Sequence, residues 1–242
     1  MVFQPKQLKS KQIWIGGTDG YVSVYPEHAK EQRNMMKKWA LSKKKPSRIR
    51  TMTVIQGKKS SSVWVGDITQ QVTIWCCDSY TMLDSITIDG RGVSNIVQHS
   101  NGSVWLGSKE SVFVFDADTK QLMQKFCAHP QAQILAMLPV GNQMWTAASD
   151  GKISVWDEQY TEITTLTAHT SKIFCLALDH RGFVWSGSFD TTIIVWDPST
   201  WKPVEELVQH QDSIRDFGIV REFVWSIALD NTLRCWTTSN VF

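Results

Sequence analysis

A histidine, a serine and an aspartate occur at spacings that could place them in one catalytic constellation. His169 is followed by Ser186 after 17 residues and by Asp190 after 21. An aspartate that orients a histidine, which in turn activates a serine, is an arrangement used for nucleophilic catalysis of acyl transfer. These residue types therefore allow a hydrolase interpretation.

The same set occurs three times, and each copy ends in a tryptophan. The three sets are His129, Thr146, Asp150 and Trp156; His169, Ser186, Asp190 and Trp196; and His210, Ser226, Asp230 and Trp236. An enzyme needs one such site, whereas a buried imidazole and a buried carboxylate need hydrogen-bond partners wherever they recur, because an unpaired buried group costs about 1–3 kcal/mol. The repetition favours a structural hydrogen-bond network over an active site.

Other motifs with known chemistry are missing from the sequence. It has no Gly-rich phosphate loop, no Gly-x-Ser-x-Gly elbow and no His-Glu-x-x-His run. Its five cysteines form no Cys-x-x-Cys pair, and His99 and His180 fall in predicted turns, so no metal site is predicted. We expect no enzyme activity and no cofactor. Cys175 and Cys235 lie in predicted strands and are expected to be buried.

One tryptophan recurs at a nearly fixed interval and shows how the chain is organised. Its six positions are Trp14, Trp64, Trp105, Trp145, Trp185 and Trp225. The last five are 41, 40, 40 and 40 residues apart, and the first interval is 50 residues. A second aromatic follows each of them after 10 or 11 residues, at Tyr25, Trp75, Phe115, Trp156, Trp196 and Trp236. A period of this length predicts a repeat architecture.

Each repeat is predicted to form four short strands. Apolar runs of four to six residues are separated by turn residues, and Asp-Gly between two β-branched runs indicates a hairpin. Four strands in 40 residues make one blade of a β-propeller. We therefore expect an all-β fold, a β-propeller of four-stranded antiparallel blades, as a single domain over residues 1–242. The six repeats make either a six-bladed ring or part of a seven-bladed one.

The last three repeats resemble the WD-repeat family of propellers. Ala168-His169 is followed after 26 residues by Trp196-Asp197, Ala128-His129 and Trp156-Asp157 have the same spacing, and Gln209-His210 with Trp236-Thr237 is a weaker copy. In that family the matching residues form a buried network across a blade, so the resemblance implies a structural role for all three sets. The Val-Trp-x-Gly strand is also similar to C-terminal propellers of large cytoplasmic signalling proteins, such as Rho guanine-nucleotide exchange factors and kinase-pathway scaffolds. The first three repeats depart from the pattern, since no histidine precedes Tyr25 or Trp75 at the expected distance.

The resemblance also implies where partners bind. In the family, ligands contact the start of each innermost strand and the residue before the hairpin aspartate. The corresponding positions here are Arg48, Arg50, Lys172, Ser213 and Arg215, together with Ser149, Phe189 and Leu229. Several of these residues are basic, which favours acidic or phosphorylated protein partners.

Charge is distributed unevenly along the chain. Residues 1–62 hold 14 Lys and Arg against three Asp and Glu, whereas residues 63–242 have a net charge of −9. Much of the positive charge lies in a basic insertion at residues 27–50, which accounts for the long first interval. Its candidate anionic-surface residues are Lys37, Lys38, Trp39, Lys43, Lys44, Lys45 and Arg48. Such a segment is typical of a solvated loop, or binds an acidic protein or phosphoinositide headgroups.

These observations lead to one expected function and one alternative. No apolar stretch reaches the roughly 20 residues that span a bilayer, and the first ten residues lack the apolar core of a signal peptide. We therefore expect a cytoplasmic, non-catalytic scaffold that docks protein partners, within a larger signalling protein. The alternative is a membrane-recruitment module that binds anionic lipid through residues 37–50; nucleic acid is the weakest candidate ligand.

Overall fold

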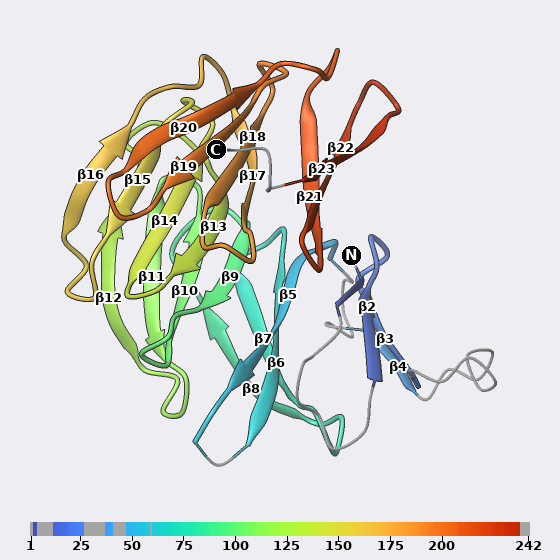
Figure 1. Ribbon diagram of the computed structural model, residues 1–242. Coiled ribbons are helices and arrows are strands. Elements are labelled where there is room, and N and C mark those ends of the chain that lie inside the picture. The colour runs from blue at the N-terminus through green and yellow to red at the C-terminus, as the bar shows by residue number, and fades with distance from the viewer. Residues whose placement is uncertain (1, 4–11, 27–36, 41–46, 59, 238–242) are drawn as a thin grey trace. The chain divides into compact units, whose positions relative to one another are not determined.

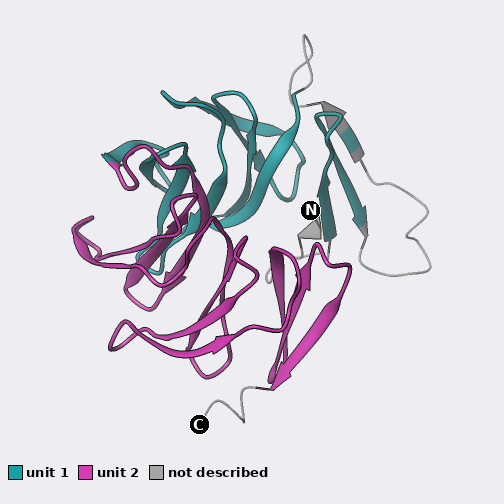
Figure 2. Ribbon diagram, turned by 90° about the horizontal axis from the view of Figure 1, so that it is seen from above, with its two compact units in different colours: residues 1–126 teal, residues 127–242 magenta. Residues whose placement is uncertain are grey.

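The computed structural model describes residues 2–3, 12–26, 37–40, 47–58 and 60–237 (Figure 1). Every regular element in these residues is a β-strand. They accordingly contain no helix that could cross a membrane. The chain divides into two compact units, residues 1–126 and 127–242, and each unit carries three antiparallel sheets (Figure 2).

The first unit holds the three sheets that we call blades 1 to 3. Blade 1 consists of β1 (Val2–Phe3), β2 (Gln12–Gly16), β3 (Tyr21–Pro26) and β4 (Lys37–Ala40). Blade 2 consists of β5 (Ile49–Gln56), β6 (Ser61–Asp67), β7 (Gln71–Cys76) and β8 (Met82–Thr87). Blade 3 consists of β9 (Asn95–Gln98), β10 (Ser103–Ser108), β11 (Ser111–Asp116) and β12 (Leu122–Cys127). In each blade the strands pair in sequence order.

The second unit holds blades 4 to 6. Blade 4 consists of β13 (Ile134–Val140), β14 (Gln143–Ala148), β15 (Ile153–Trp156) and β16 (Glu162–Leu166). Blade 5 consists of β17 (Ile173–Leu178), β18 (Val184–Ser188), β19 (Ile193–Asp197) and β20 (Lys202–Leu207). Blade 6 consists of β21 (Ile214–Val220), β22 (Phe223–Ala228) and β23 (Leu233–Thr237). The four-stranded antiparallel blades of a β-propeller are thereby confirmed, with three strands in the described part of blade 6.

The recurring tryptophan lies at the centre of each blade, on the second strand. Its exposed fraction is at most 1% at Trp14, Trp64, Trp105, Trp145 and Trp185, and Trp225 is half-buried. A buried indole N–H needs an acceptor. In the first four blades the acceptor is the side chain two residues earlier on the same strand, namely Gln12, Ser62, Ser103 and Gln143. The tryptophan therefore buries a large apolar ring without leaving its polar atom unpaired.

Neighbouring blades of a unit pack through aliphatic side chains on the inner strands. Ile173 of blade 5 lies in one core cluster with Ile153 and Val155 of blade 4. In the same way Ile214 of blade 6 packs with Ile193 of blade 5. All five side chains are fully buried, and burial of one such side chain contributes about 1.5–3 kcal/mol.

Gly187 permits the close approach of blades 5 and 6. A Cβ atom added at this glycine would lie 2.5 Å from Cγ2 of Ile214 and 2.8 Å from Sγ of Cys175. Both distances are far below ordinary van der Waals contact, so a larger residue would push the two blades apart. The glycine in the Trp-Ser-Gly run is thus required by packing.

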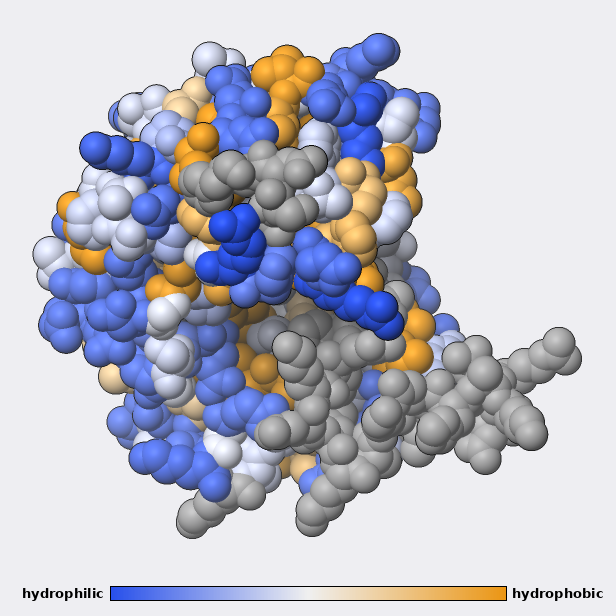
Figure 3. All heavy atoms as spheres, in the orientation of Figure 1, coloured by the Kyte–Doolittle hydropathy of each residue, from blue (hydrophilic) through white to orange (hydrophobic). Residues whose placement is uncertain are grey.

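One outer face of blade 6 differs from its counterparts in blades 4 and 5. Leu233 is 59% exposed and Ile227 is 46% exposed, and Figure 3 shows apolar side chains among hydrophilic ones over β21–β23. Cys235 is also exposed, although Cys175 is buried. The prediction of a buried Cys235 was therefore wrong, because its side of β23 is left exposed by the residues that the structure describes.

The basic insertion is in part an outer strand. Lys37, Lys38 and Trp39 belong to β4, which pairs with β3, so this part of residues 27–50 completes blade 1. Lys43, Lys44 and Lys45 lie outside the described residues, as do residues 27–36 and 41–46 in general.

Candidate functional site

The histidine of blade 5 is the centre of a buried hydrogen-bond network. His169 donates from Nδ1 to Oδ2 of Asp190 over 3.0 Å, and its Nε2 lies 2.7 Å from the hydroxyl of Ser186. In the tautomer with the proton on Nδ1, Nε2 accepts from that hydroxyl. The same hydroxyl oxygen accepts the indole N–H of Trp196 over 2.8 Å. The network joins the entry to β17 with β18, β19 and the turn between them.

Blade 6 repeats this geometry. His210 lies 2.9 Å from Oδ2 of Asp230 and 2.7 Å from the hydroxyl of Ser226, which accepts the indole N–H of Trp236 over 2.9 Å. Each aspartate also accepts a backbone N–H next to the histidine, from Thr170 in blade 5 and Gln211 in blade 6.

A threonine that the sequence reasoning missed completes both networks. Thr192 donates its hydroxyl to Oδ1 of Asp190 over 2.6 Å and lies 3.1 Å from Nδ1 of His169. Thr232 occupies the same place beside Asp230 and His210. The signal was present in the sequence as Asp-x-Thr after the second strand, in two of the three sets.

Blade 4 makes only part of the network. His129 bonds to the hydroxyl of Thr146 over 2.9 Å, and that hydroxyl accepts the indole N–H of Trp156 over 3.0 Å. Asp150 is 3.8 Å from Nδ1 of His129, beyond hydrogen-bond distance. Lys152 stands where the other blades have the threonine, so no hydroxyl holds this aspartate against the ring.

The surroundings of the three networks set the pKa values of their members. Burial alone would raise the pKa of Asp190, but hydrogen bonds from His169 and Thr192 outweigh it and hold that pKa well below its usual range. Hydrogen bonding from Thr232 is the main reason why the pKa of Asp230 is also depressed. In blade 4 burial lowers the pKa of His129, although the charge of Asp150 opposes the shift.

The pKa of His129 predicts a pH dependence for the unfolding of the second unit. A histidine has a pKa of about 6.5 when unfolded, so below that pH the unfolded chain takes up a proton that folded His129 resists, and stability falls as the pH falls. Thermal unfolding from pH 7 to pH 5 should show a loss of Tm that is smaller in His129→Gln. His180→Gln, at an exposed histidine, should keep the wild-type slope; equal slopes for both variants would contradict the assignment.

The triad interpretation does not fit this geometry. Ser186 and Thr146 are fully buried, and the hydroxyl of Ser186 is already bonded to His169 and Trp196. A nucleophile must reach its substrate, and this oxygen cannot. Within the described part of the chain, no three His, Cys, Asp or Glu side chains gather in a way that could hold a metal ion.

The predicted partner-binding residues lie at a repeated junction between the second hairpin turn and the inner strand. The backbone N–H of Phe189 donates to the carbonyl of Lys172 over 2.8 Å, and that of Leu229 donates to the carbonyl of Ser213 over 3.0 Å. Equivalent bonds join Ser149 to Gln133 in blade 4 and Ile68 to Arg48 in blade 2. The junction thus brings two chain segments of each blade together.

A β-bulge follows each junction. The strand register shifts on the inner strand in blades 2, 4, 5 and 6, and the residues inserted there are Arg50, Leu135, Phe174 and Arg215. A bulge turns the inserted side chain away from the regular alternation of the strand. Arg50 and Arg215 were predicted from the sequence, whereas Phe174 was missed. Arg50 follows Arg48 by two residues, and the same offset from Lys172 would have identified Phe174.

In the second unit these positions form a mixed aromatic and cationic group on blades 5 and 6. Phe174 lies edge-to-face against Phe189 at 6.3 Å, and the guanidinium carbon of Arg215 lies 4.1 Å from the centre of the Phe174 ring. Phe189 is 52% exposed, and Arg215 and Lys172 are exposed as well. We call Lys172, Phe174, Phe189 and Arg215 the Phe174 cluster.

The remaining predicted contacts differ in accessibility. Leu229 is 54% exposed, and Ser149 is half-buried. Ser213 is fully buried, and its backbone carbonyl accepts the N–H of Leu229; contact of Ser213 with a partner stays a prediction. Arg48 and Arg50 are exposed on blade 2, in the first unit.

Of the predicted lipid-binding residues, Lys38 already has partners. Its ammonium group lies 3.7 Å from Asp19 and 4.6 Å from the centre of the Tyr21 ring. The side chains of Lys37 and Trp39 lie outside what the structure describes. Lipid binding by residues 37–50 therefore stays a prediction, as does the whole set of candidate site residues.

Comparison with known proteins agrees with the geometry of the second unit. The family model described as "WD domain, G-beta repeat" matches residues 160–197, which include most of blade 5. The DENN domain and WD repeat-containing protein SCD1 of Arabidopsis thaliana is 27% identical over 127 residues, covering 51% of this chain and 11% of SCD1.

A second relative and a solved structure extend the comparison. The probable serine/threonine-protein kinase pats1 of Dictyostelium discoideum is 26% identical over 192 residues, covering 64% of this chain and 6% of pats1. The chain therefore spans only a small part of these relatives. The crystal structure of the computationally designed Ika8 protein matches 96% of this chain and 69% of its own with a TM-score of 0.79. At 23% identity this likeness shows the fold alone.

Proposed function

Because this chain belongs to the WD-repeat family, we propose that it is a non-catalytic docking module whose Phe174 cluster binds protein partners. The observation that carries the proposal is the contrast between the buried histidine networks and the exposed Phe174 cluster. The hydroxyls of the histidine networks are buried and already bonded, whereas Lys172, Phe189 and Arg215 are exposed side by side with a second aromatic ring. Aromatic and arginine side chains dominate the binding energy of protein interfaces.

The charge of the cluster points to an acidic or phosphorylated ligand. Residues 127–242 contain seven Lys and Arg against 13 Asp and Glu, so the two cations of the cluster, Lys172 and Arg215, are exposed on an acidic unit. The guanidinium carbon of Arg215 lies 4.1 Å from the centre of the Phe174 ring, and a guanidinium suits bidentate contact with a carboxylate or phosphate. Lys172 adds a second positive charge.

We also infer that the module works in a cytoplasmic signalling protein larger than this chain. The support is the small share of pats1 and SCD1 that the chain matches, together with the Val-Trp-x-Gly strands. The narrower likeness to the propellers of Rho guanine-nucleotide exchange factors stays a prediction.

Quantitative affinity capture from cell extract tests the docking surface. The double variant Phe189→Ala with Arg215→Glu should lose at least about tenfold of each specifically bound protein and keep the wild-type Tm. The matched control is Val220→Ala with Arg221→Glu, an exposed apolar residue and an arginine at the other end of β21, and it should bind like the wild type.

Phosphatase treatment of the extract identifies the ligand. A drop in capture after treatment supports a phosphorylated partner, and unchanged capture supports acidic side chains. If the two double variants capture the same proteins in the same amounts as the wild type, the Phe174 cluster is not the docking surface.

A further inference from the structure

Three exposed arginines surround one turn of blade 2, in the first unit. Arg48 directly precedes β5, Arg50 lies in β5, and Arg91 lies in the loop between β8 and β9. The turn between β6 and β7 carries Ile68, whose side chain is 51% exposed. We call Arg48, Arg50, Ile68 and Arg91 the Ile68 site.

One peptide bond shows how two of these arginines flank the turn. The N–H of Ile68 donates to the carbonyl of Arg48 over 3.0 Å, and the carbonyl of Asp67 accepts the N–H of Val93 over 3.0 Å. The N–H and C=O of one trans peptide point in opposite directions, and no described peptide bond is cis. The segment with Arg48 and the segment with Arg91, two residues before Val93, therefore lie on opposite sides of the turn.

The repeat places the third arginine, Arg50, beside the same turn. Arg50 is the residue inserted by the β-bulge of β5, and its counterpart in blade 5 is Phe174. The ring of Phe174 lies 6.3 Å from that of Phe189. Phe189 is the counterpart of Ile68, because both donate their N–H to the carbonyl that precedes the inner strand of their own blade.

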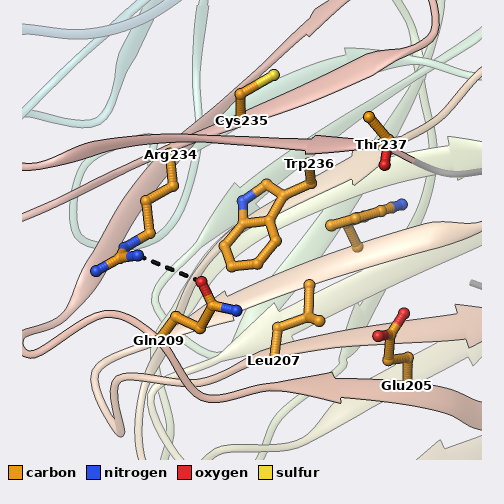
Figure 4. Close-up of a pocket in the computed structure, with 8 residues that line it drawn as sticks. Glu205, Leu207, Gln209, Arg234, Cys235, Trp236 and Thr237 are labelled. Carbon is orange, nitrogen blue, oxygen red and sulfur yellow. Dashed lines mark hydrogen bonds between the residues drawn. The ribbon is translucent and has the colours of Figure 1, made fainter. Parts of the chain in front are cut away.

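The three guanidinium groups have no hydrogen-bond or ion-pair partner within the described part of the chain. In blade 6, by contrast, Arg234 donates from Nη1 to Gln209 over 3.3 Å (Figure 4). Two carboxylates adjoin the Ile68 site in sequence, and both are engaged elsewhere. Asp89 lies 3.0 Å from the ammonium group of Lys125, and Asp67 is buried and bonded within its own turn. Residues 1–62 hold only three acidic side chains against 14 Lys and Arg.

A pocket lies between the turn and the loop that carries Arg91. It has a volume of about 520 Å³, and its lining residues, which include Ile68, Thr87 and Arg91, contain no carboxylate. The side-chain amide of Gln70 donates to the carbonyl of residue 90 over 2.7 Å and holds the loop against the turn. Gly92 permits this approach, since its φ is +60° and an added Cβ would lie 2.6 Å from the carbonyl oxygen of Ile68.

We propose that the Ile68 site binds a phosphorylated serine or threonine of a partner protein, with an apolar side chain next to it in the pocket. A carboxylate offers two oxygens and one charge. A phosphate monoester offers three acceptor oxygens and about −1.5 to −2 charges, so it can bind several guanidinium groups at once. Ile68 supplies the apolar contact for the neighbouring side chain.

The proposal does not depend on the docking function of the Phe174 cluster, because the two sites share no residue. They also differ in charge. The position two residues before the buried Val93 holds Arg91, whereas the position two residues before its counterpart Ile214 holds Asp212, which is exposed. Cations therefore flank the turn on both sides in blade 2, and a cation and an acid flank it in blade 5.

A capped, fluorescent peptide with phosphothreonine between two isoleucines, flanked by glycines, is the probe. Fluorescence anisotropy should show saturable binding to the wild-type chain, at least about tenfold weaker when threonine or glutamate replaces phosphothreonine. The phosphopeptide with glycine in place of both isoleucines should also bind more weakly, because the apolar contact is lost. The absence of saturable binding, or a phosphopeptide that binds no tighter than the threonine or the glutamate peptide, would overturn the proposal.

Protein variants locate the phosphate. Arg50→Gln with Arg91→Gln should weaken binding of the phosphopeptide at least about tenfold and keep the wild-type Tm, since both side chains are exposed. The matched control, Arg181→Gln with Arg221→Gln, removes the same charge from two exposed arginines of the second unit and should bind like the wild type. Equal weakening in both double variants would show a general effect of net charge and would contradict the site.

Two further results would assign the phosphate or the arginines differently. Loss of the phosphopeptide in Phe189→Ala with Arg215→Glu, but not in the variant of Arg50 and Arg91, would place the phosphate in the Phe174 cluster. Vesicles of phosphatidylcholine with phosphatidylinositol 4,5-bisphosphate test for a membrane ligand. Pelleting of the wild type that is lost in the variant of Arg50 and Arg91, without any binding of the phosphopeptide, would assign the arginines to lipid. Either result would overturn the proposal.

Discussion

Replacing Trp185 by alanine is expected to lower the free energy of unfolding of the second unit by about 3–5 kcal/mol. The ring is fully buried, packs edge-to-face with Phe217 at 6.4 Å, and donates its indole N–H to Asp179 over 3.0 Å. The substitution removes a large apolar surface from the core between blades 5 and 6 and leaves a cavity. Urea denaturation followed by fluorescence measures the change.

Two further substitutions separate packing from exposure. Trp185→Phe keeps an aromatic ring but loses the bond to Asp179, so its cost should lie between those of wild type and alanine. Phe189→Ala, at a ring that is 52% exposed, should cost less than about 1 kcal/mol. A similar loss of stability for Phe189→Ala and Trp185→Ala would contradict the assignment of Trp185 to the core.

Asp190→Ala is expected to cost about 2–4 kcal/mol, because it leaves the buried Nδ1–H of His169 and two less buried donors without an acceptor. His169 loses the acceptor of its Nδ1 proton, and the backbone N–H of Thr170 and the hydroxyl of Thr192 lose theirs. Asp150→Ala is the matched control in blade 4, where the carboxylate is 3.8 Å from the ring; it should cost under about 1 kcal/mol. Equal costs at the two positions would show that the network is not what stabilises blade 5.

The acid dependence of the same variant follows from the depressed pKa of Asp190. A carboxyl whose folded pKa is lowered stabilises the protein above the unfolded value of about 3.9 and loses that contribution as the pH falls below it. The difference in stability between the wild type and Asp190→Ala should therefore shrink between pH 5 and pH 2.

Much of the fold could be predicted because one residue type marks the register. The interval between tryptophans fixed the blades, and Asp-Gly turns fixed the hairpins at Asp19 and Asp150, since both signals are local in sequence. The second aromatic of each repeat, from Trp75 to Trp236, likewise marks the third strand of its blade. The repeat pattern could not show that part of the basic insertion forms β4, because ten residues, 27–36, separate β4 from β3, whereas five residues separate β8 from β7 in blade 2.

The candidate site was only partly predictable for the same reason. The sequence pointed to Lys172, Phe189 and Arg215 through their place in the repeat. It could not show that Arg215 stacks on Phe174, because a β-bulge turns one side chain toward the next blade. Nor could it show that Ser213 is buried, or that Asp150 stands too far from His129 to bond. These depend on how two chain segments meet in space.

The measurement that tests the central claim most directly compares partner binding with stability in Asp190→Ala. The claim is that the histidine networks hold the blades together and that binding belongs to the exposed surface. A partner identified by affinity capture should bind this variant with the wild-type Kd at a temperature where the variant is folded, although its Tm is lowered. A wild-type Tm together with lost binding would contradict the claim and return His169, Ser186 and Asp190 to a direct functional role.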